Sequence, residues 1–82
     1  MQRLESQEFD EVRAAVAVRL RELRQARGLS QEALADQAGC HRTYVGMLER
    51  SLGNPSLHVL TRLAVALRVS VASLLEPRED NS

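Results

Sequence analysis

Two short segments of helical apolar spacing, residues 31–38 and 42–50, are separated by only Gly39, Cys40 and His41. Glycine takes the positive φ that a tight turn needs without steric cost. Two helices joined by so short a turn pack as neighbours, with their apolar faces toward a shared core. This pair of segments therefore constrains the fold of the chain more than any other feature.

The rest of the chain also shows helical rather than alternating apolar spacing, so we expect an all-α fold, a compact bundle of five short helices. The expected helices cover residues 9–27, 31–38, 42–50, 57–67 and 71–75. Gly28 and Gly39 are suited to end the first two helices. Serine precedes three of the helices as a candidate N-cap, at positions 30, 56 and 70. His41 takes the N-cap place of the helix at 42–50, where it is a poorer cap.

The core must be aliphatic, because the sequence has only two aromatic residues, Phe9 and Tyr44. The spacing places the following residues inward: Phe9, Val12, Val16, Leu20, Leu23, Leu34, Ala38, Val45, Leu48, Leu57, Leu60, Ala64 and Leu67. We expect Cys40 to pack beneath the turn. Four residues of the helix at 42–50 are expected to face outward: Thr43, Gly46, Met47 and Arg50.

At 82 residues the chain has room for one domain. We place this domain at residues 9–75, after an N-terminal extension (1–8) and before a disordered polar tail (76–82). A domain this small buries only about 60 % of its unfolded surface, so a second copy would add useful burial. Val69, Val71, Leu74 and Leu75 are therefore a candidate dimer interface, unless they cap the core of the monomer instead.

Charge is distributed unevenly, although the net charge is zero. Residues 12–75 hold nine arginines against four acidic residues, whereas both ends are acidic. A basic region of this kind can bind a polyanion. All the cationic side chains are arginines, whose planar fork suits phosphate and guanine.

Other classes of protein are disfavoured by what the sequence lacks. It has no apolar run that could span a membrane and no secretory leader, so we expect a cytoplasmic protein. Cys40, His41 and His58 are too few for a zinc site, and we predict no metal, cofactor or small-molecule ligand. There is no set of residues for nucleophilic catalysis and no phosphate-binding glycine loop, so we do not expect an enzyme.

The segment 31–50 has the frame of a helix-turn-helix, whose second helix enters the major groove of DNA. Such a helix needs polar side chains at its N-terminal end and apolar ones behind them. Arg42, Thr43 and Tyr44, followed by Val45 and Leu48, meet this requirement.

The sequence resembles the Cro/C1-type helix-turn-helix family, also called the xenobiotic-response-element family, which has a lambda-repressor-like fold. The resemblance covers about Val12 to Leu75 and rests on residues 30–35, Gly39, 42–45, 48–50 and 54–57. Within the family, the Arg-Thr-Tyr start of the second helix is most similar to the controller proteins of restriction–modification systems. The resemblance implies a repressor or activator that binds an inverted repeat in double-stranded DNA as a homodimer.

The resemblance also implies roles for individual residues. It implies base contacts at Arg42, Thr43 and Met47. It implies backbone contacts at Gln31, Tyr44, Asn54 and Arg50. It implies a semi-buried structural ion pair between Arg24 and Glu49. The sequence departs from the family pattern at Ser51, where glycine is common, and at Met47, which is apolar where many members have a polar base reader.

These positions also have purely structural interpretations. Arg42 could be a solvated arginine, Thr43 a simple helix start and Tyr44 a half-buried packing residue. Gln31 could be an ordinary first-turn residue, and Asn54 could only shape its turn. The arginines of the first helix could be solvated or could face the DNA backbone. At the level of function, the alternative is an antitoxin or interaction module of the same fold that binds a protein partner.

Overall fold

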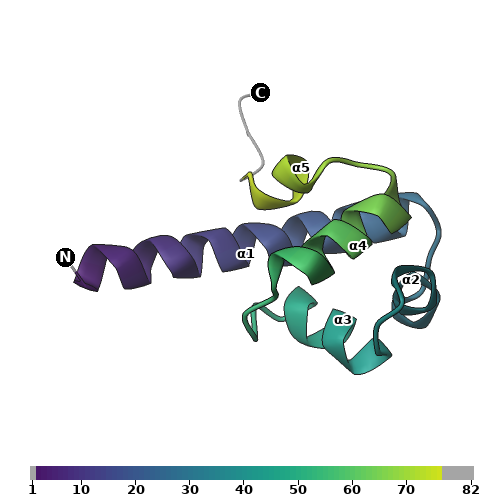
Figure 1. The fold of residues 1–82 in the computed structure, drawn as a ribbon, viewed down its shortest axis with the longest axis horizontal. Helices are drawn as coiled ribbons and strands as arrows, with labels where there is room; N and C mark the ends of the chain where they lie inside the picture. The colour runs from purple at the N-terminus through teal and green to yellow at the C-terminus, as the bar shows by residue number, and fades with distance from the viewer. Residues whose placement is uncertain (1, 77–82) are drawn as a thin grey trace.

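The structure is a computed structural model that describes residues 2–76, with side chains from residue 5 onward. It contains α1 (Gln2–Ala26), α2 (Gln31–Ala38), α3 (Arg42–Glu49), α4 (Leu57–Leu67) and α5 (Val71–Leu75), joined by short loops (Figure 1). Residues 2–76 include no strand, and the predicted all-α class with five helices is confirmed. Within the same residues, no helix is both long and apolar enough to cross a membrane.

Helix α1 is longer than expected. It begins at Gln2 rather than at Phe9, and it has 25 residues. Residues 2–8 have no complete apolar stripe, but they are rich in Glu and Gln, which are good helix formers. A helix that has nucleated against the core propagates easily into such a segment. The extension expected at the N-terminus therefore continues α1 from Gln2, whereas residues 77–82 of the expected tail lie outside the described residues.

The serine caps explain why three of the other helices begin where the sequence predicts. The hydroxyls of Ser30, Ser56 and Ser70 accept hydrogen bonds from the backbone N–H groups three residues later, at 2.9, 3.1 and 3.2 Å. Each bond satisfies a backbone donor that the first helical turn leaves without a partner.

The core lies where α1 packs on α3 and α5, and where α2 packs on α3 and α4 (Figure 1). Its largest fully buried side chains are Leu20, Leu34, Val45, Leu48, Leu63, Leu67 and Leu74. Leu23, Cys40 and Tyr44 are partly buried against this cluster. In the second helix of the predicted helix-turn-helix, Val45 and Leu48 are part of this core and fix the helix against it.

The predicted inward stripes are correct in the middle of the domain and wrong at its edges. Phe9 and Val12 remain 40 % and 41 % exposed, because the N-terminal half of α1 projects past the other helices (Figure 1). Leu57, in the first turn of α4, is 73 % exposed. Gly46, expected to face outward, is buried, and a Cβ added there would lie 3.5 Å from the side chain of Gln31.

Helix α5 contributes to the core as well as to the surface. Leu74 is 0 % exposed in the monomer, and Val69, Val71 and Leu75 are partly buried against the same core. The expected dimer interface therefore needs a correction, because Leu74 has no surface to offer to a partner.

Candidate DNA interface

The turn between α2 and α3 is held by hydrogen bonds to two helices. Gly39 has φ 74° and ψ 32°, in the left-handed region that glycine enters at little cost. The N–H of Cys40 donates to the carbonyl of Ala35 at 2.9 Å, and Nη1 of Arg62 in α4 donates to the carbonyl of Gly39 at 3.2 Å. These contacts fix the direction in which α3 leaves the turn.

His41 caps α3, as the sequence predicts. Its Nδ1 accepts a hydrogen bond from the backbone N–H of Thr43 at 3.1 Å. His41, Arg42 and Thr43 are all exposed. The cap therefore starts the helix with its leading side chains in solvent.

Helix α3 has one face in the core and one face outward. Val45, Leu48 and Glu49, spaced by three and four residues, are buried. The opposite face of α3 and its C-cap carry Thr43, Met47 and Arg50, which are also spaced by three and four residues. Thr43 and Arg50 are exposed, while Met47 is half-buried against the following loop, where its Cε lies 3.5 Å from the position of a Cβ added to Gly53.

Two further predicted contact residues differ in their surroundings. Tyr44 is half-buried and packs against the core, in agreement with the structural interpretation of this residue. Asn54 is exposed in the loop between α3 and α4. The outward surface thus includes both ends of α3 and the loop that follows it.

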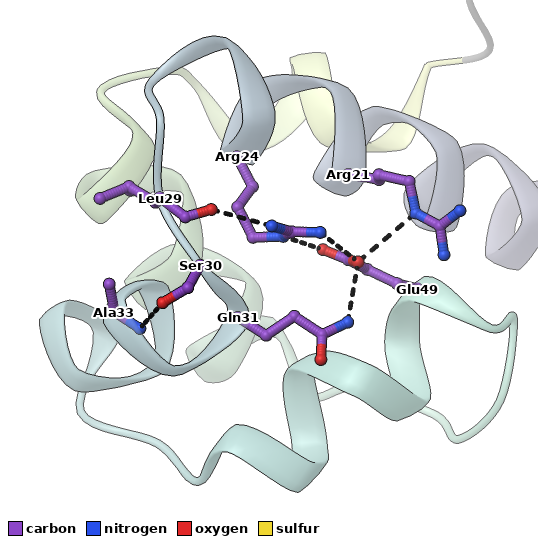
Figure 2. A network of polar contacts seen from close by, with 7 residues as sticks. All are labelled: Arg21, Arg24, Leu29, Ser30, Gln31, Ala33 and Glu49. Atoms are coloured by element: carbon purple, nitrogen blue, oxygen red, sulfur yellow. Dashed lines mark hydrogen bonds and ion pairs between the residues drawn. The ribbon is translucent and has the colours of Figure 1, made fainter.

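Glu49 is the centre of a polar network beneath this surface (Figure 2). Its carboxylate accepts hydrogen bonds from Nε and Nη2 of Arg24 at 2.6 and 3.0 Å and from Nε2 of Gln31 at 3.1 Å. Nε of Arg21 lies 3.5 Å from Oε1 of Glu49. The network joins α1, α2 and α3, and it includes the Arg24–Glu49 ion pair that the resemblance implies.

Both members of the ion pair are stabilised in their charged forms. Burial raises the pKa of the Glu49 carboxyl, but hydrogen bonds from Arg24 and Gln31, together with the charges of Arg24 and Arg21, outweigh burial and bring the pKa below its ordinary value. The hydrogen bond to Glu49 raises the pKa of Arg24, although burial opposes this. Nη1 of Arg24 also donates to the carbonyl of Leu29 at 2.8 Å.

Gln31 has a structural partner that the sequence analysis missed. Its side chain, which the resemblance assigns to a phosphate, donates to Glu49 from the first turn of α2. This bond uses one of the two N–H groups of the amide, and the other can still donate. No local signal links positions 31 and 49, because the helices that carry them meet only in the folded protein.

Arg13 is a second residue that the sequence analysis missed. Its Nη1 donates to the carbonyl of Gly53 at 3.5 Å, and its Nη2 pairs with Asp10 at 3.1 Å. Its guanidinium carbon lies 4.9 Å from the centre of the Phe9 ring. Arg13 therefore connects α1 to the loop that carries Asn54.

The same loop shows the consequence of the departure from the family pattern at Ser51. Ser51 has φ 60°, in the left-handed region, where the family often has glycine. This conformation costs a residue with a side chain about 1–2 kcal/mol. The loop therefore keeps the backbone shape that glycine would favour, at the expense of some stability.

A helix-turn-helix with a capped second helix and an exposed polar start defines a class of DNA-binding domain. The model of the helix-turn-helix family matches residues 20–74, and the chain belongs to this family. The relatives that the chain matches include HTH-type transcriptional regulators, which confirms the expected class and the expectation that the chain is not an enzyme.

Three relatives illustrate the similarity. The control protein C.SmaI of Serratia marcescens is 43 % identical over 67 residues, which are 82 % of this chain and 80 % of that protein. The crystal structure of the restriction-modification controller protein C.AhdI from Aeromonas hydrophila has a TM-score of 0.73 at 47 % identity, covering 76 % of this chain and 94 % of C.AhdI. The structure of SinR, the master regulator for biofilm formation, in complex with DNA has a TM-score of 0.72 at 35 % identity, covering 74 % of this chain and 98 % of that one.

Proposed function

We propose that this chain is a sequence-specific regulator of transcription that binds double-stranded DNA as a homodimer, with α3 of each copy in the major groove of one half of an inverted repeat. The observation that carries the proposal is the orientation of α3. Arg42 and Thr43 stand in solvent at its N-terminal end, while Val45, Leu48 and Glu49 anchor its other face. SinR, a relative of the same fold, has a structure in complex with DNA, which supports DNA as the partner of this chain.

The proposed base contacts follow from the chemistry of the outward side chains. Arg42 would donate two hydrogen bonds to O6 and N7 of a guanine, the commonest specific contact in the major groove. Thr43 would contact a base edge or a thymine methyl group. Met47, which is apolar and half-buried, would contribute van der Waals contact only, so we expect weak discrimination at its position.

The proposed backbone contacts surround these positions. Arg50 and Asn54 are exposed near the C-terminal end of α3, and Gln31 lies in the first turn of α2. The unpaired N–H groups at a helix start favour phosphate. Tyr44, which lies at the edge of the core, would also contact the DNA backbone. Such contacts set register and orientation, whereas the base contacts give specificity.

A dimer is proposed because one short helix reads too few base pairs. Two copies of α3 spaced by roughly 34 Å would read the two halves of an inverted repeat. Val69, Val71 and Leu75 are candidates for the interface. The similarity to C.SmaI and C.AhdI favours the role of a controller protein in a restriction–modification system.

Selection of bound sequences from a pool of random DNA duplexes tests the proposal. We expect an inverted repeat with half-sites about 10 base pairs apart, centre to centre. The affinity for this repeat should fall steeply and linearly on a log–log plot against salt concentration, because phosphate contacts release counterions. A pool without an enriched sequence, together with binding indifferent to salt, would rule the proposal out.

A further inference from the structure

The apolar stripe of α1 extends beyond the core of the monomer. Phe9, Val12, Val16 and Leu20 follow one another at spacings of three and four residues and therefore share one face of the helix. Val16 and Leu20 are buried, whereas Phe9 and Val12 are not, because α1 continues past the other four helices (Figure 1). Within the described residues, the outer part of this stripe is therefore an apolar helix face that stays partly open to solvent.

A groove lies beside this partly open face. Its lining includes Phe9, Val12, Arg13, Pro55, Leu60 and Leu75. The groove has a volume of about 120 Å³, whereas small-molecule pockets typically have about 300–1,000 Å³. It therefore suits one or two side chains from another protein better than a small-molecule ligand.

We propose that a second copy of this chain docks at this groove, so that the N-terminal half of α1 and α5 together form the dimer interface. This inference rests on the proposed homodimer and specifies which surface holds it. The same patch of both copies would meet across a two-fold axis.

The size of α5 supports this extension of the interface. A stable interface buries about 800 Å² per partner, from about 20–30 residues on each side. Helix α5 has five residues, and Leu74 among them is fully buried in the monomer. Leu75 lines the groove, so the apolar surface continues from α5 directly onto α1. A surface that includes both helices comes closer to the required area.

The position of the groove also fits the spacing of the two reading helices. Leu48, near the C-terminal end of α3, lines the groove. Eight residues of helix are about 12 Å long, so a two-fold axis beyond this end would place Arg42 more than about 12 Å from the axis. Half of the roughly 34 Å between major-groove sites is about 17 Å, which is compatible with this arrangement.

The test compares two variants of the full chain by sedimentation equilibrium. Phe9→Gln combined with Val12→Gln removes apolar surface beside the groove. Val18→Gln is the matched control, because Val18 is also an apolar residue of α1, is 51 % exposed and is not part of the groove lining. Far-UV circular dichroism verifies that both variants keep their helices. If the double variant loses helix content, Val12→Gln alone replaces it.

We expect the dissociation constant of the dimer to rise about tenfold or more in the double variant, and about threefold or more with Val12→Gln alone. The control should stay within about twofold of the wild type. A wild-type dimer that neither groove variant weakens would overturn the inference and leave the proposed homodimer intact. A wild type that binds its DNA repeat as a monomer would overturn both.

Discussion

Nε of Arg24 donates to Oε2 of Glu49 at 2.6 Å, and this contact ties α1 to α3 across 25 positions of the sequence. The side chain of Glu49 is 0 % exposed and that of Arg24 is 12 % exposed. Since Glu49 lies on the inner face of α3, the pair also holds the orientation in which Arg42 and Thr43 face outward. The ion pair therefore links the stability of the domain to the geometry of its proposed DNA interface.

Removing one member of this pair should be costly. Arg24→Leu or Glu49→Leu leaves the other charge without its partner, and we expect each to lower the free energy of unfolding by about 3 kcal/mol. The double variant should lose clearly less than the sum of the two, because it leaves no uncompensated charge. Urea denaturation of the wild type, the two single variants and the double variant measures these free energies of unfolding. Arg21→Leu, at a more exposed pair, should cost less than about 1 kcal/mol, and strictly additive losses would contradict the assigned role.

Stability should decrease in acid partly through Glu49. Its pKa is below the ordinary value in the folded protein, so the unfolded chain takes up the proton first as the pH falls. The free energy of unfolding therefore decreases once the pH drops below about 5, toward the lower pKa of the folded state. The stability difference between the wild type and Glu49→Gln, measured by urea denaturation, should shrink from pH 7 to pH 3. If the stability difference between the two proteins is constant from pH 7 to pH 3, Glu49 does not contribute to the loss of stability in acid.

Gly46→Ala should stabilise the domain. Glycine inside a helix costs about 1 kcal/mol relative to alanine, and the added Cβ would make an ordinary contact of 3.5 Å with Gln31. We expect a gain of about 0.5–1 kcal/mol in the free energy of unfolding, measured by thermal or urea denaturation. A loss would mean that the contact between α2 and α3 is tighter than this distance indicates.

The effects of truncating Leu74 and Leu57 on stability should be the reverse of what their predicted positions imply. The sequence places Leu74 at a dimer interface and Leu57 in the core. Leu74→Ala removes a fully buried side chain and should lower the free energy of unfolding by about 2–5 kcal/mol. Leu57→Ala, at a position that is 73 % exposed, should change it by about 0.5 kcal/mol or less. Denaturation at a single protein concentration compares the two. Equal losses would place Leu57 in a contact that the monomer does not show.

Arg42→Ala should reduce affinity for the selected DNA repeat by about 1–3 kcal/mol and relax specificity at one base position in each half-site. The control is Arg68→Asn, which also removes one exposed arginine. Arg68 has φ 62°, a conformation that asparagine tolerates, and it follows α4 rather than the helix-turn-helix. Fluorescence anisotropy with the repeat and with single-base variants measures both changes. A loss of affinity that is uniform over all base variants would assign Arg42 to phosphate instead.

The starts of α2 to α5 could be predicted because their signals are local. A serine hydroxyl bonds an N–H group three residues away, and Gly39 takes its left-handed conformation at the turn itself. The start of α1 was not predictable in the same way, since the residue before Gln2 is a methionine, which is not a type that favours the N-cap. The polar sequence before Phe9 continues the helix without adding to the apolar stripe.

Burial at the edges of the domain depended on where neighbouring helices end. Phe9 and Val12 have the same spacing as Val16 and Leu20, but they lie at the open edge of the core, where they line a groove. Gly46 has the spacing of the outer face of its helix, but Gln31 of α2 lies against it. A periodic pattern identifies the face of a helix and says nothing of how far its neighbours extend.

The sequence by itself determined the number and order of the helices and the three-residue turn, because caps, glycine and apolar spacing act within one or two helical turns. Only the tertiary structure decided that Gln31 meets Glu49, 18 positions away, and that Arg13 meets Gly53, 40 positions away. Such pairs form when separate helices pack, and packing geometry is a property of the whole chain rather than of any local pattern.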